Sequence, residues 1–200
     1  MSFTIRKATE ADVPALSRIC LLTADAGSSA EALHDYPELP GLIFSVPYVK
    51  LPTTWAFVLV DEASDTVIGY IVGSTDTREY ERYAEEHWWP PLAEKYPPSI
   101  AKKPTDEKYM GFLQKMFRAP DANIAFSPAH LHINILPGYQ RQGLGRKMIE
   151  KAIEYLKEAE VGGVWLGIDP RNQNARKFYE RVGFKPIEGV PDNNLGLKFA

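Results

Sequence analysis

The sequence predicts an α/β protein built on a mixed β-sheet. Apolar runs rich in β-branched residues recur along the chain and are bounded by turn-forming residues. In the last third, amphipathic segments with helical spacing separate these runs, which is the pattern of β-helix-β connections. With 200 residues, 44% of them hydrophobic, the chain is long enough to bury one core, so we expect a single domain over residues 1–200.

The first half of the chain predicts three strands and one long helix. Residues 3–8 alternate in polarity and predict a strand, and residues 9–26 have helical composition. Residues 27–54 are rich in glycine, proline and serine and predict turns with short helical pieces. Residues 54–60 and 66–74 are apolar, β-branched runs on either side of a polar turn, so they predict a hairpin.

The second half predicts a helical insertion, at about 77–129, followed by alternating strands and helices. The insertion is far longer than a usual connection. Its first part, residues 77–97, has helical composition up to Pro90 and Pro91, where a helix must stop or kink. The remaining elements, in order, are a helix over 105–118, a strand over 130–136, a helix over 145–159, a strand over 161–168, a short helix over 174–184, and two strands over 184–189 and 194–200.

Composition and charge exclude several classes of protein. The net charge is -3, so no overall basic field favours nucleic acid or an anionic membrane as a partner. The polar start is neither a signal peptide nor a membrane span, and no apolar stretch reaches 18 residues. Cys20 is the one cysteine, so an intrachain disulfide is impossible. These features predict a cytoplasmic protein.

The turn before the helix at 145–159 is the most informative stretch. A helix N-terminus exposes unpaired backbone N–H groups, and glycines such as Gly143 and Gly145 let a ligand approach them. Arg141 and Arg146 add positive charge that suits a diphosphate. The simpler interpretation is a tight turn without a ligand. The dinucleotide fingerprint is absent because Met148 stands where its third glycine is required, and the P-loop pattern does not occur.

The neighbouring residues resemble a known family. Gln140, Gly143 and Gly145 satisfy [QR]-x-x-G-x-[GA], the acyl-CoA signature of the GNAT N-acetyltransferases, and "NQNARKFYERVGF" (172–184) is similar to the family's second signature. The resemblance implies a sheet that splays apart between two parallel strands, with the pantetheine arm of acetyl-CoA in the gap and the diphosphate on the glycine turn. It implies that acetyl-CoA contacts Ile135, Leu136, Gln140, Arg141, Gln142, Gly143, Leu144, Gly145, Arg146, Asn172, Asn174 and Tyr179.

Transfer of an acyl group to an amine needs an acid and a base. The resemblance makes Tyr179 the acid that protonates the departing thiolate. Its spacing alone favours a different interpretation, a core residue of an amphipathic helix. The strand at 130–136 has no acidic residue, so His132 is the candidate base, with Asp169 and Asp76 as rivals. The backbone N–H near Ile135 or Leu136 is the candidate oxyanion donor. His132 and His130 lack a nearby third ligand in sequence, so we expect no metal.

The insertion is the candidate wall of the acceptor site. Trp88 and Trp89 are followed by two prolines, which suits a rigid aromatic lid; packing onto the insertion's own domain is the simpler alternative. Residues 85–97 also resemble relatives of the acetyltransferase-like C-terminal domain of O-GlcNAcase. The loop at 34–48 is the candidate opposite wall. With Asp76 and with Asn134, which shares a strand face with His132, the tryptophans complete the predicted substrate residues.

Two functions therefore follow from the sequence. The first is an acetyl-CoA-dependent N-acetyltransferase in which a primary amine of a small molecule or peptide attacks the thioester directly. The alternative is a catalytically weak or inactive acyl-CoA-binding module that serves as a sensor or interaction domain. A nucleotide-binding oxidoreductase fails because the glycine fingerprint is incomplete. The sequence is compatible with a homodimer.

Overall fold

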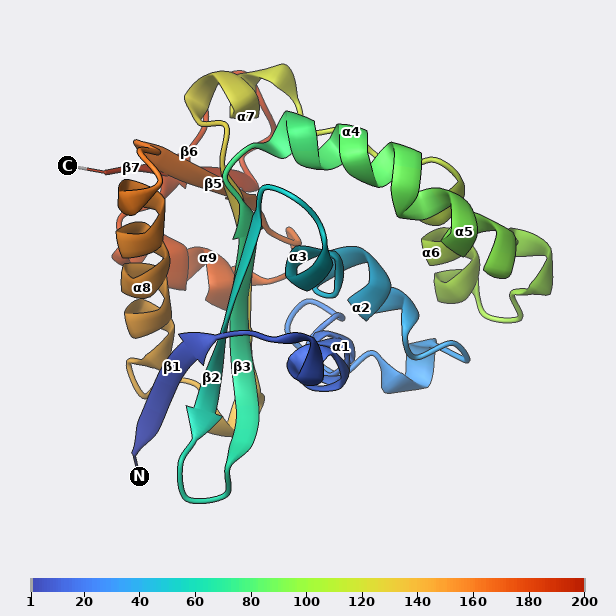
Figure 1. Ribbon diagram of the computed structural model, residues 1–200, viewed down its shortest axis with the longest axis horizontal. Helices are drawn as coiled ribbons and strands as arrows, with labels where there is room; N and C mark the ends of the chain where they lie inside the picture. Colours follow the sequence, from blue (N-terminus) through green and yellow to red (C-terminus); the bar gives the residue numbers. More distant parts are fainter. Residues whose placement is uncertain (1, 200) are drawn as a thin grey trace.

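The computed structural model describes residues 2–199 and contains a seven-stranded sheet with helices on both faces (Figure 1). The strand order is β1-β2-β3-β4-β5-β7-β6, antiparallel except for the parallel pair β4 and β5. This arrangement confirms the predicted α/β class with a mixed sheet. The strands are β1 (Phe3–Lys7), β2 (Thr54–Asp61), β3 (Thr66–Ser74), β4 (His130–Ile135), β5 (Gly163–Gly167), β6 (Lys185–Pro186) and β7 (Asn194–Lys198).

Most helices lie within segments for which the sequence predicts helical structure, although their ends differ from the predicted ones. The α-helices are α1 (Val13–Leu21), α2 (Leu39–Phe44), α3 (Pro47–Lys50), α4 (Thr77–His87), α5 (Trp89–Lys95), α6 (Pro104–Gln114), α7 (Asp121–Phe126), α8 (Leu144–Glu158) and α9 (Gln173–Arg181). Short 3-10 turns are η1 (Glu10–Asp12), η2 (Glu31–Leu33), η3 (Pro98–Ile100) and η4 (Pro137–Tyr139).

Three elements differ from the sequence prediction, and one of them was not predicted at all. The prolines at 90 and 91 lie in the first turn of α5, where a missing N–H costs nothing, so they begin a second helix rather than only ending the first. The helix α7 has no counterpart in the sequence interpretation because its six residues are too few to show a period. The strand predicted at 184–189 shrinks to β6, which pairs with β7 at two positions.

The sheet opens between β4 and β5. These parallel strands are paired at one register position, His130 with Trp165, whereas β3 and β4 are paired over six positions. Beyond His130 the two strands diverge, and their edges face each other across a gap. This is the splayed pair of parallel strands that the sequence resemblance implies.

The two faces of the sheet carry different cores. Met148, Ile149 and Leu156 of α8 pack with Leu131 and other apolar residues on one face. Helices α1 and α3 cover the opposite face, as Figure 1 also shows. Side chains alternate along β4, so even-numbered residues such as His132 lie on the α1 side and odd-numbered ones on the α8 side.

The insertion at 77–129 packs against α2. Leu39 and Ile43 of α2 share a third apolar cluster with Trp89 of α5 and with Met110 and Leu113 of α6. In Figure 1 the helices α4, α5 and α6 extend together to one side of the sheet, beside α2. The insertion therefore combines the two roles that the sequence left open. It packs onto its own domain through α2, and it also forms a wall of the cleft described below.

Gly73 marks the tightest approach in the sheet, and we expect Gly73→Ala to lower the free energy of unfolding by about 1–3 kcal/mol. A Cβ there would collide with the His130 carbonyl oxygen and lie 2.6 Å from the Trp55 ring. Gly111→Ala is the control, because nothing lies within 4 Å of its Cβ in α6 and helix propensity favours alanine by up to about 1 kcal/mol. Urea denaturation measures both, and equal stabilities would contradict the packing described.

Candidate active site

Two cavities meet at β4 and the end of β5. The larger has a volume of about 920 Å³ and lies between the insertion, α2, α3 and the sheet. The smaller, of about 180 Å³, lies in the gap between the diverging strands. Four residues line both: Leu131, His132, Gly167 and Ile168. A molecule in one cavity and a molecule in the other would therefore come together at His132.

The small cavity follows from the splay of the sheet. Ile133 and Asn134 of β4 form one wall, and Asp169, just after β5, lies on the other. The loop after α1 contributes Thr23, Ala24, Ala26 and Gly27, and α9 contributes Tyr179. The cavity is thus an extension of the gap into which the resemblance puts the pantetheine arm.

The backbone of β4 offers unpaired donors to this gap. Leu136 donates its N–H to the Ile68 carbonyl at 2.9 Å, toward β3. In an antiparallel pair the direction of the N–H alternates, so Ile133 and Ile135 direct theirs toward β5. The prediction of Leu136 as an oxyanion donor is therefore wrong, because its N–H is already bonded in the sheet. Of the two predicted donors, Ile135 remains a candidate.

The N-terminus of α8 has the form expected of an anion site. Gly143 is its N-cap with a left-handed φ of 77°, a conformation that favours glycine. Gly145 has another reason to be glycine, since an added Cβ would lie 2.9 Å from the Phe178 ring of α9. Arg141 and Arg146 are exposed beside this turn. Free N–H groups and two guanidinium groups therefore occur together.

The other predicted cofactor residues of this turn stabilise it. The Gln140 side chain donates to the Ile135 carbonyl at 2.8 Å, which ties the turn to the end of β4. Gln142 donates to the Gly138 carbonyl at 3.4 Å, and Arg146 to the Arg181 carbonyl at 3.4 Å. Leu144 is buried in the core on the α8 side, so only its backbone is available to a ligand.

Tyr179 lies on α9 and lines the small cavity. Its side chain is 7% exposed, packs against Phe178 and Phe184, and burial raises the pKa of its phenol above the ordinary value. The Asn172 side chain caps α9 by accepting the Ala175 N–H at 2.9 Å and also lines the cavity. Asn174 is exposed on the first turn of α9 and does not line the cavity.

His132 is held in a chain of hydrogen bonds with His130. Its Nε2 lies 3.1 Å from the Tyr48 hydroxyl, which also lies 2.8 Å from the Nε2 of His130. The Nδ1 of His130 lies 2.8 Å from the Thr77 hydroxyl. Burial lowers the pKa of His132 to about 4 and that of His130 well below its ordinary value, so both rings are neutral near pH 7.

The rival bases are less available. Asp169 forms a two-contact ion pair with Arg171, with oxygen–nitrogen distances of 2.8 and 3.1 Å, and this partner lowers the pKa of Asp169. Asp76 caps α4 by accepting the Glu79 N–H at 3.0 Å and lines neither cavity. The geometry therefore favours His132 as the base.

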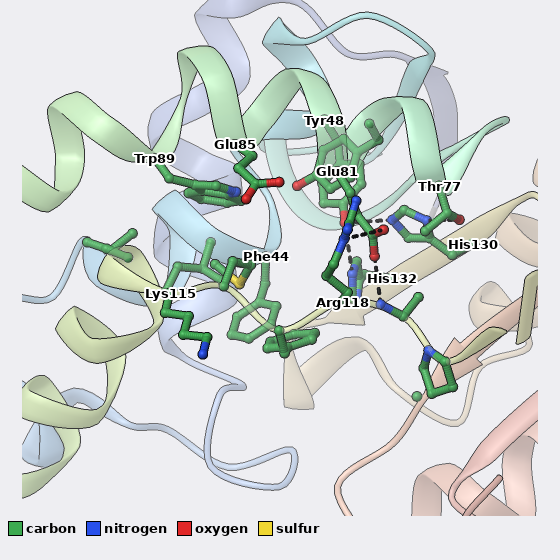
Figure 2. Close-up of a pocket in the computed structure, with 18 of the residues that line it drawn as sticks. Phe44, Tyr48, Thr77, Glu81, Glu85, Trp89, Lys115, Arg118, His130 and His132 are labelled. Carbon is green, nitrogen blue, oxygen red and sulfur yellow. Dashed lines mark hydrogen bonds and ion pairs between the residues drawn. The ribbon is translucent and has the colours of Figure 1, made fainter.

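The large cleft is mostly apolar, with charges at its edges. Figure 2 shows Glu85 beside Trp89 at one end, and His130 and Thr77 at the other. The Glu81 carboxylate accepts the Ala119 N–H at 2.6 Å, and this contact holds residues 115–120 against α4. The acidic helix α4 thus faces a basic segment that contains Lys115 and Arg118.

The predicted substrate residues divide between the cavities. Trp89 lines the large cleft, whereas Trp88 donates its indole N–H to the Leu42 carbonyl at 3.0 Å and is not part of the lining. Asn134 lies in the small cavity, where its amide is bonded to the Thr23 hydroxyl. The predictions for Trp88, Asp76 and Asn134 as walls of the acceptor site are therefore not supported by the geometry.

Several residues of the site were not predicted. Phe44, Tyr48, Thr77, Glu81 and Trp165 line the large cleft. The loop at 34–48 was expected to form a wall, and Phe44 and Tyr48 lie on it, but no pattern in the sequence singles them out. Within residues 2–199, no three His, Cys, Asp or Glu side chains are placed to hold a metal ion. No helix in that range is long and apolar enough to cross a membrane.

The buried histidines make stability depend on pH. Burial lowers the pKa of His132 to about 4 in the folded protein, against about 6.5 when unfolded, so its contribution to stability is present above pH 6.5 and is lost as the pH falls toward 4. Between pH 7 and pH 5 we expect the free energy of unfolding to fall by about 1–2 kcal/mol from His132 alone. Urea titrations of the protein and of His132→Asn measure this; parallel losses in both would contradict it.

Comparison with known proteins identifies the relatives of this site. A family model described as "Acetyltransferase (GNAT) family" matches residues 30–184. An uncharacterised N-acetyltransferase of Mycobacterium tuberculosis is 31% identical over 91 residues, which cover 46% of this chain and 54% of that protein. The chain thus spans about half the length of the curated relatives it matches.

Solved structures agree along the whole chain. The crystal structure of SsHAT has 33% sequence identity and a TM-score of 0.86, with all of both chains covered. The PaiA N-acetyltransferase of Thermoplasma acidophilum, solved in complex with coenzyme A, has 15% identity and a TM-score of 0.58, again with both chains covered completely. The second likeness shows the shared fold.

Proposed function

The chain belongs to the acetyltransferase (GNAT) family, and on that premise we propose that it is an acetyl-CoA-dependent N-acetyltransferase whose acceptor is a primary amine. The observation that carries the proposal is the meeting of the two cavities at His132. The small cavity suits the acyl arm and the large cleft suits the acceptor. The amine would then attack the thioester directly, beside a neutral histidine.

The residues on the donor side fit acetyl-CoA. The N–H groups that begin α8, with Arg141 and Arg146, would hold the diphosphate. The N–H group of Ile133 would bond a pantetheine amide in place of a neighbouring strand, which leaves the Ile135 N–H for the oxyanion. When bound, acetyl-CoA supplies an acetyl group on a thioester. The Ile135 N–H is the donor closest in sequence to the end of β4 and would stabilise the oxyanion.

His132 would take the proton of the reacting amine. A free alkylamine is mostly protonated at neutral pH, since its pKa is about 10.4, and a histidine titrating near 4 is too weak to deprotonate it. Attack by the neutral fraction of the amine places a positive charge on its nitrogen and makes that nitrogen more acidic. His132 then accepts this proton, for which a neutral ring with a free lone pair is sufficient.

Tyr179 would supply the proton for the departing thiolate. Its raised pKa keeps the phenol protonated, so a proton is available in the small cavity. A covalent route through a cysteine lacks a nucleophile. Cys20 is 3% exposed, lines neither cavity, and has its pKa raised to about 11 by burial.

The acceptor would enter through the large cleft. Its apolar walls, with Phe44 and Trp89, suit an amine that carries an apolar or aromatic group. Glu85 has no ion-pair partner among residues 2–199 and would attract a cation to the cleft. Both a small molecule and a peptide side chain or N-terminus meet this description, and the direct test must include both.

Thiol release from acetyl-CoA tests the proposal when it is followed with a panel of aromatic amines, aliphatic amines and peptides. We expect turnover with at least one apolar amine and saturable binding of acetyl-CoA by calorimetry. NADH and ATP are the control ligands. Binding of NADH without binding of acetyl-CoA would sink the proposal.

The acyl-CoA-binding module remains the second candidate because one observation favours it. Side-chain contacts hold the loop after α1 over the small cavity. The Asn134 amide donates to the Thr23 hydroxyl, and Arg171 forms ion pairs with Asp25, at 2.9 Å, and with Asp169. Such fastening narrows the gap and would slow exchange of the acyl arm. Binding of acetyl-CoA without thiol release from any amine would favour this candidate over the enzyme.

A further inference from the structure

The hydrogen bonds around His132 form a chain of fixed direction. The chain begins at the Pro128 carbonyl, which has no hydrogen to donate. The Thr77 hydroxyl lies 2.6 Å from this oxygen, so the hydroxyl proton must lie between the two atoms. Thr77 therefore donates to Pro128 and is left as an acceptor for its other neighbour.

Each following link is then determined. The Nδ1 of His130 lies 2.8 Å from the Thr77 oxygen and must carry a hydrogen to bond it. A neutral imidazole carries one hydrogen, so the Nε2 of His130 is bare. It accepts the Tyr48 hydroxyl proton over 2.8 Å. Because the Tyr48 hydroxyl proton is donated to His130, the Tyr48 oxygen can only accept a hydrogen bond from His132.

The last link sets the state of His132. Its Nε2, 3.1 Å from the Tyr48 oxygen, must carry the hydrogen, which leaves the lone pair on Nδ1. Nδ1 lies on the ring edge away from Tyr48 and has no hydrogen-bond partner among residues 2–199. It is also not among the buried polar atoms that lack a partner, so it is accessible from the cavities that His132 lines.

We propose that Thr77, His130 and Tyr48 are positioning residues that fix His132 in the tautomer with hydrogen on Nε2, so that Nδ1 is the proton acceptor of the acetyl transfer. This inference rests on the proposed function for its catalytic part only. The tautomer itself is a property of the protein without substrate.

The residues packed around Tyr48 and His130 keep this chain of hydrogen bonds in one protonation state. The Tyr48 ring stacks on Tyr80 with 5.0 Å between the ring centroids, and the Glu81 carboxylate acts on both phenols. Burial first, then Tyr80 and Glu81, raise the pKa of Tyr48, so its phenol keeps the proton that the chain requires. His130 is 5% exposed and lies between Trp165, Tyr48 and Tyr80.

Nitrogen NMR of ¹⁵N-histidine-labelled protein tests the inference without any turnover. A bare imidazole nitrogen resonates far from a protonated one, so the spectrum reads the tautomer of each ring. We expect His130 to carry hydrogen on Nδ1 and His132 on Nε2. In Tyr48→Phe, which keeps the ring and removes the hydroxyl, we expect His132 to show a mixture of tautomers.

Activity provides the second readout. We expect Tyr48→Phe and Thr77→Val to lower kcat/KM by about 3- to 10-fold, the factor that one hydrogen bond between neutral groups supports. Thr77→Ser keeps the hydroxyl and should restore both the tautomer and the rate. Tyr96→Phe is the matched control, because it removes a tyrosine hydroxyl that bonds Glu38 at 2.7 Å, outside the site.

The outcomes separate the two proposals. A His132 with hydrogen on Nδ1, or a tautomer unchanged in Tyr48→Phe, would overturn the inference even if the protein is active. The expected tautomers in a protein that acetylates no amine would support the positioning chain and count against the proposed enzyme.

Discussion

His132→Asn should lower kcat/KM for acetyl transfer by about 10²–10⁴-fold, the usual effect of removing a general base. Asparagine keeps a polar side chain of moderate size but cannot accept a proton. Among residues 2–199, His132 is the one ionisable side chain that lines both cavities. Steady-state thiol release measures the loss. His87→Asn is the control, since His87 is exposed at the end of α4 and lines neither cavity.

The loss should depend on the acceptor. A weakly basic amine gives a more acidic nitrogen after attack and needs less help from a base, so the defect of His132→Asn should shrink along a series of amines of falling pKa. A defect that stays constant along the series would assign His132 to structure or binding, and full activity would remove it from the mechanism.

Tyr179→Phe should lower kcat by about 10²-fold or more through loss of the proton donor to the thiolate. The phenylalanine ring keeps the contacts with Phe178 and Phe184, so the fold should survive. The affinity for acetyl-CoA, measured by calorimetry, should change little. Unlike the loss in His132→Asn, this loss should not vary with the basicity of the amine.

Measuring the stability of Tyr179→Phe distinguishes a loss of catalysis from a loss of packing. Since its hydroxyl has no hydrogen-bond partner among residues 2–199, removing it should leave the urea midpoint within experimental error of the parent protein. Tyr96→Phe, which loses a hydrogen bond outside the site, should be less stable but fully active. An active Tyr179→Phe would show that another group protonates the thiolate.

The last third of the chain could be predicted closely because its signals are local. The glycine turn, the helix α8 and the capping of α9 by Asn172 each depend on residues a few positions apart. The splay between β4 and β5 was accessible only through family resemblance, because no local pattern states where two strands stop pairing.

The acceptor side could not be predicted to the same depth because its contacts join distant segments. Tyr48 is 82 residues from His130 and 84 from His132, and Thr77 is 53 from His130. Asp76 looked like a candidate base beside the hairpin, yet it caps a helix, while its neighbour Thr77 bonds His130. The role of each is set by which side chain turns toward β4, which tertiary packing decides.

The insertion shows the same limit. The two adjacent tryptophans cannot be distinguished in the sequence, yet their environments differ. Trp89 lines the cleft, whereas Trp88 donates its indole N–H to the backbone of α2. Trp88 is the residue between α4 and α5, and Trp89 begins α5, so tertiary packing of the two helices determines which indole reaches the cleft.

A crystal structure of the protein with coenzyme A bound would show whether the donor occupies the gap between β4 and β5. We expect the diphosphate on the N–H groups that begin α8, the pantetheine arm between β4 and β5, and the sulfur within hydrogen-bond reach of the Tyr179 hydroxyl. Coenzyme A bound elsewhere, or a gap closed by direct pairing of β4 with β5, would contradict the account.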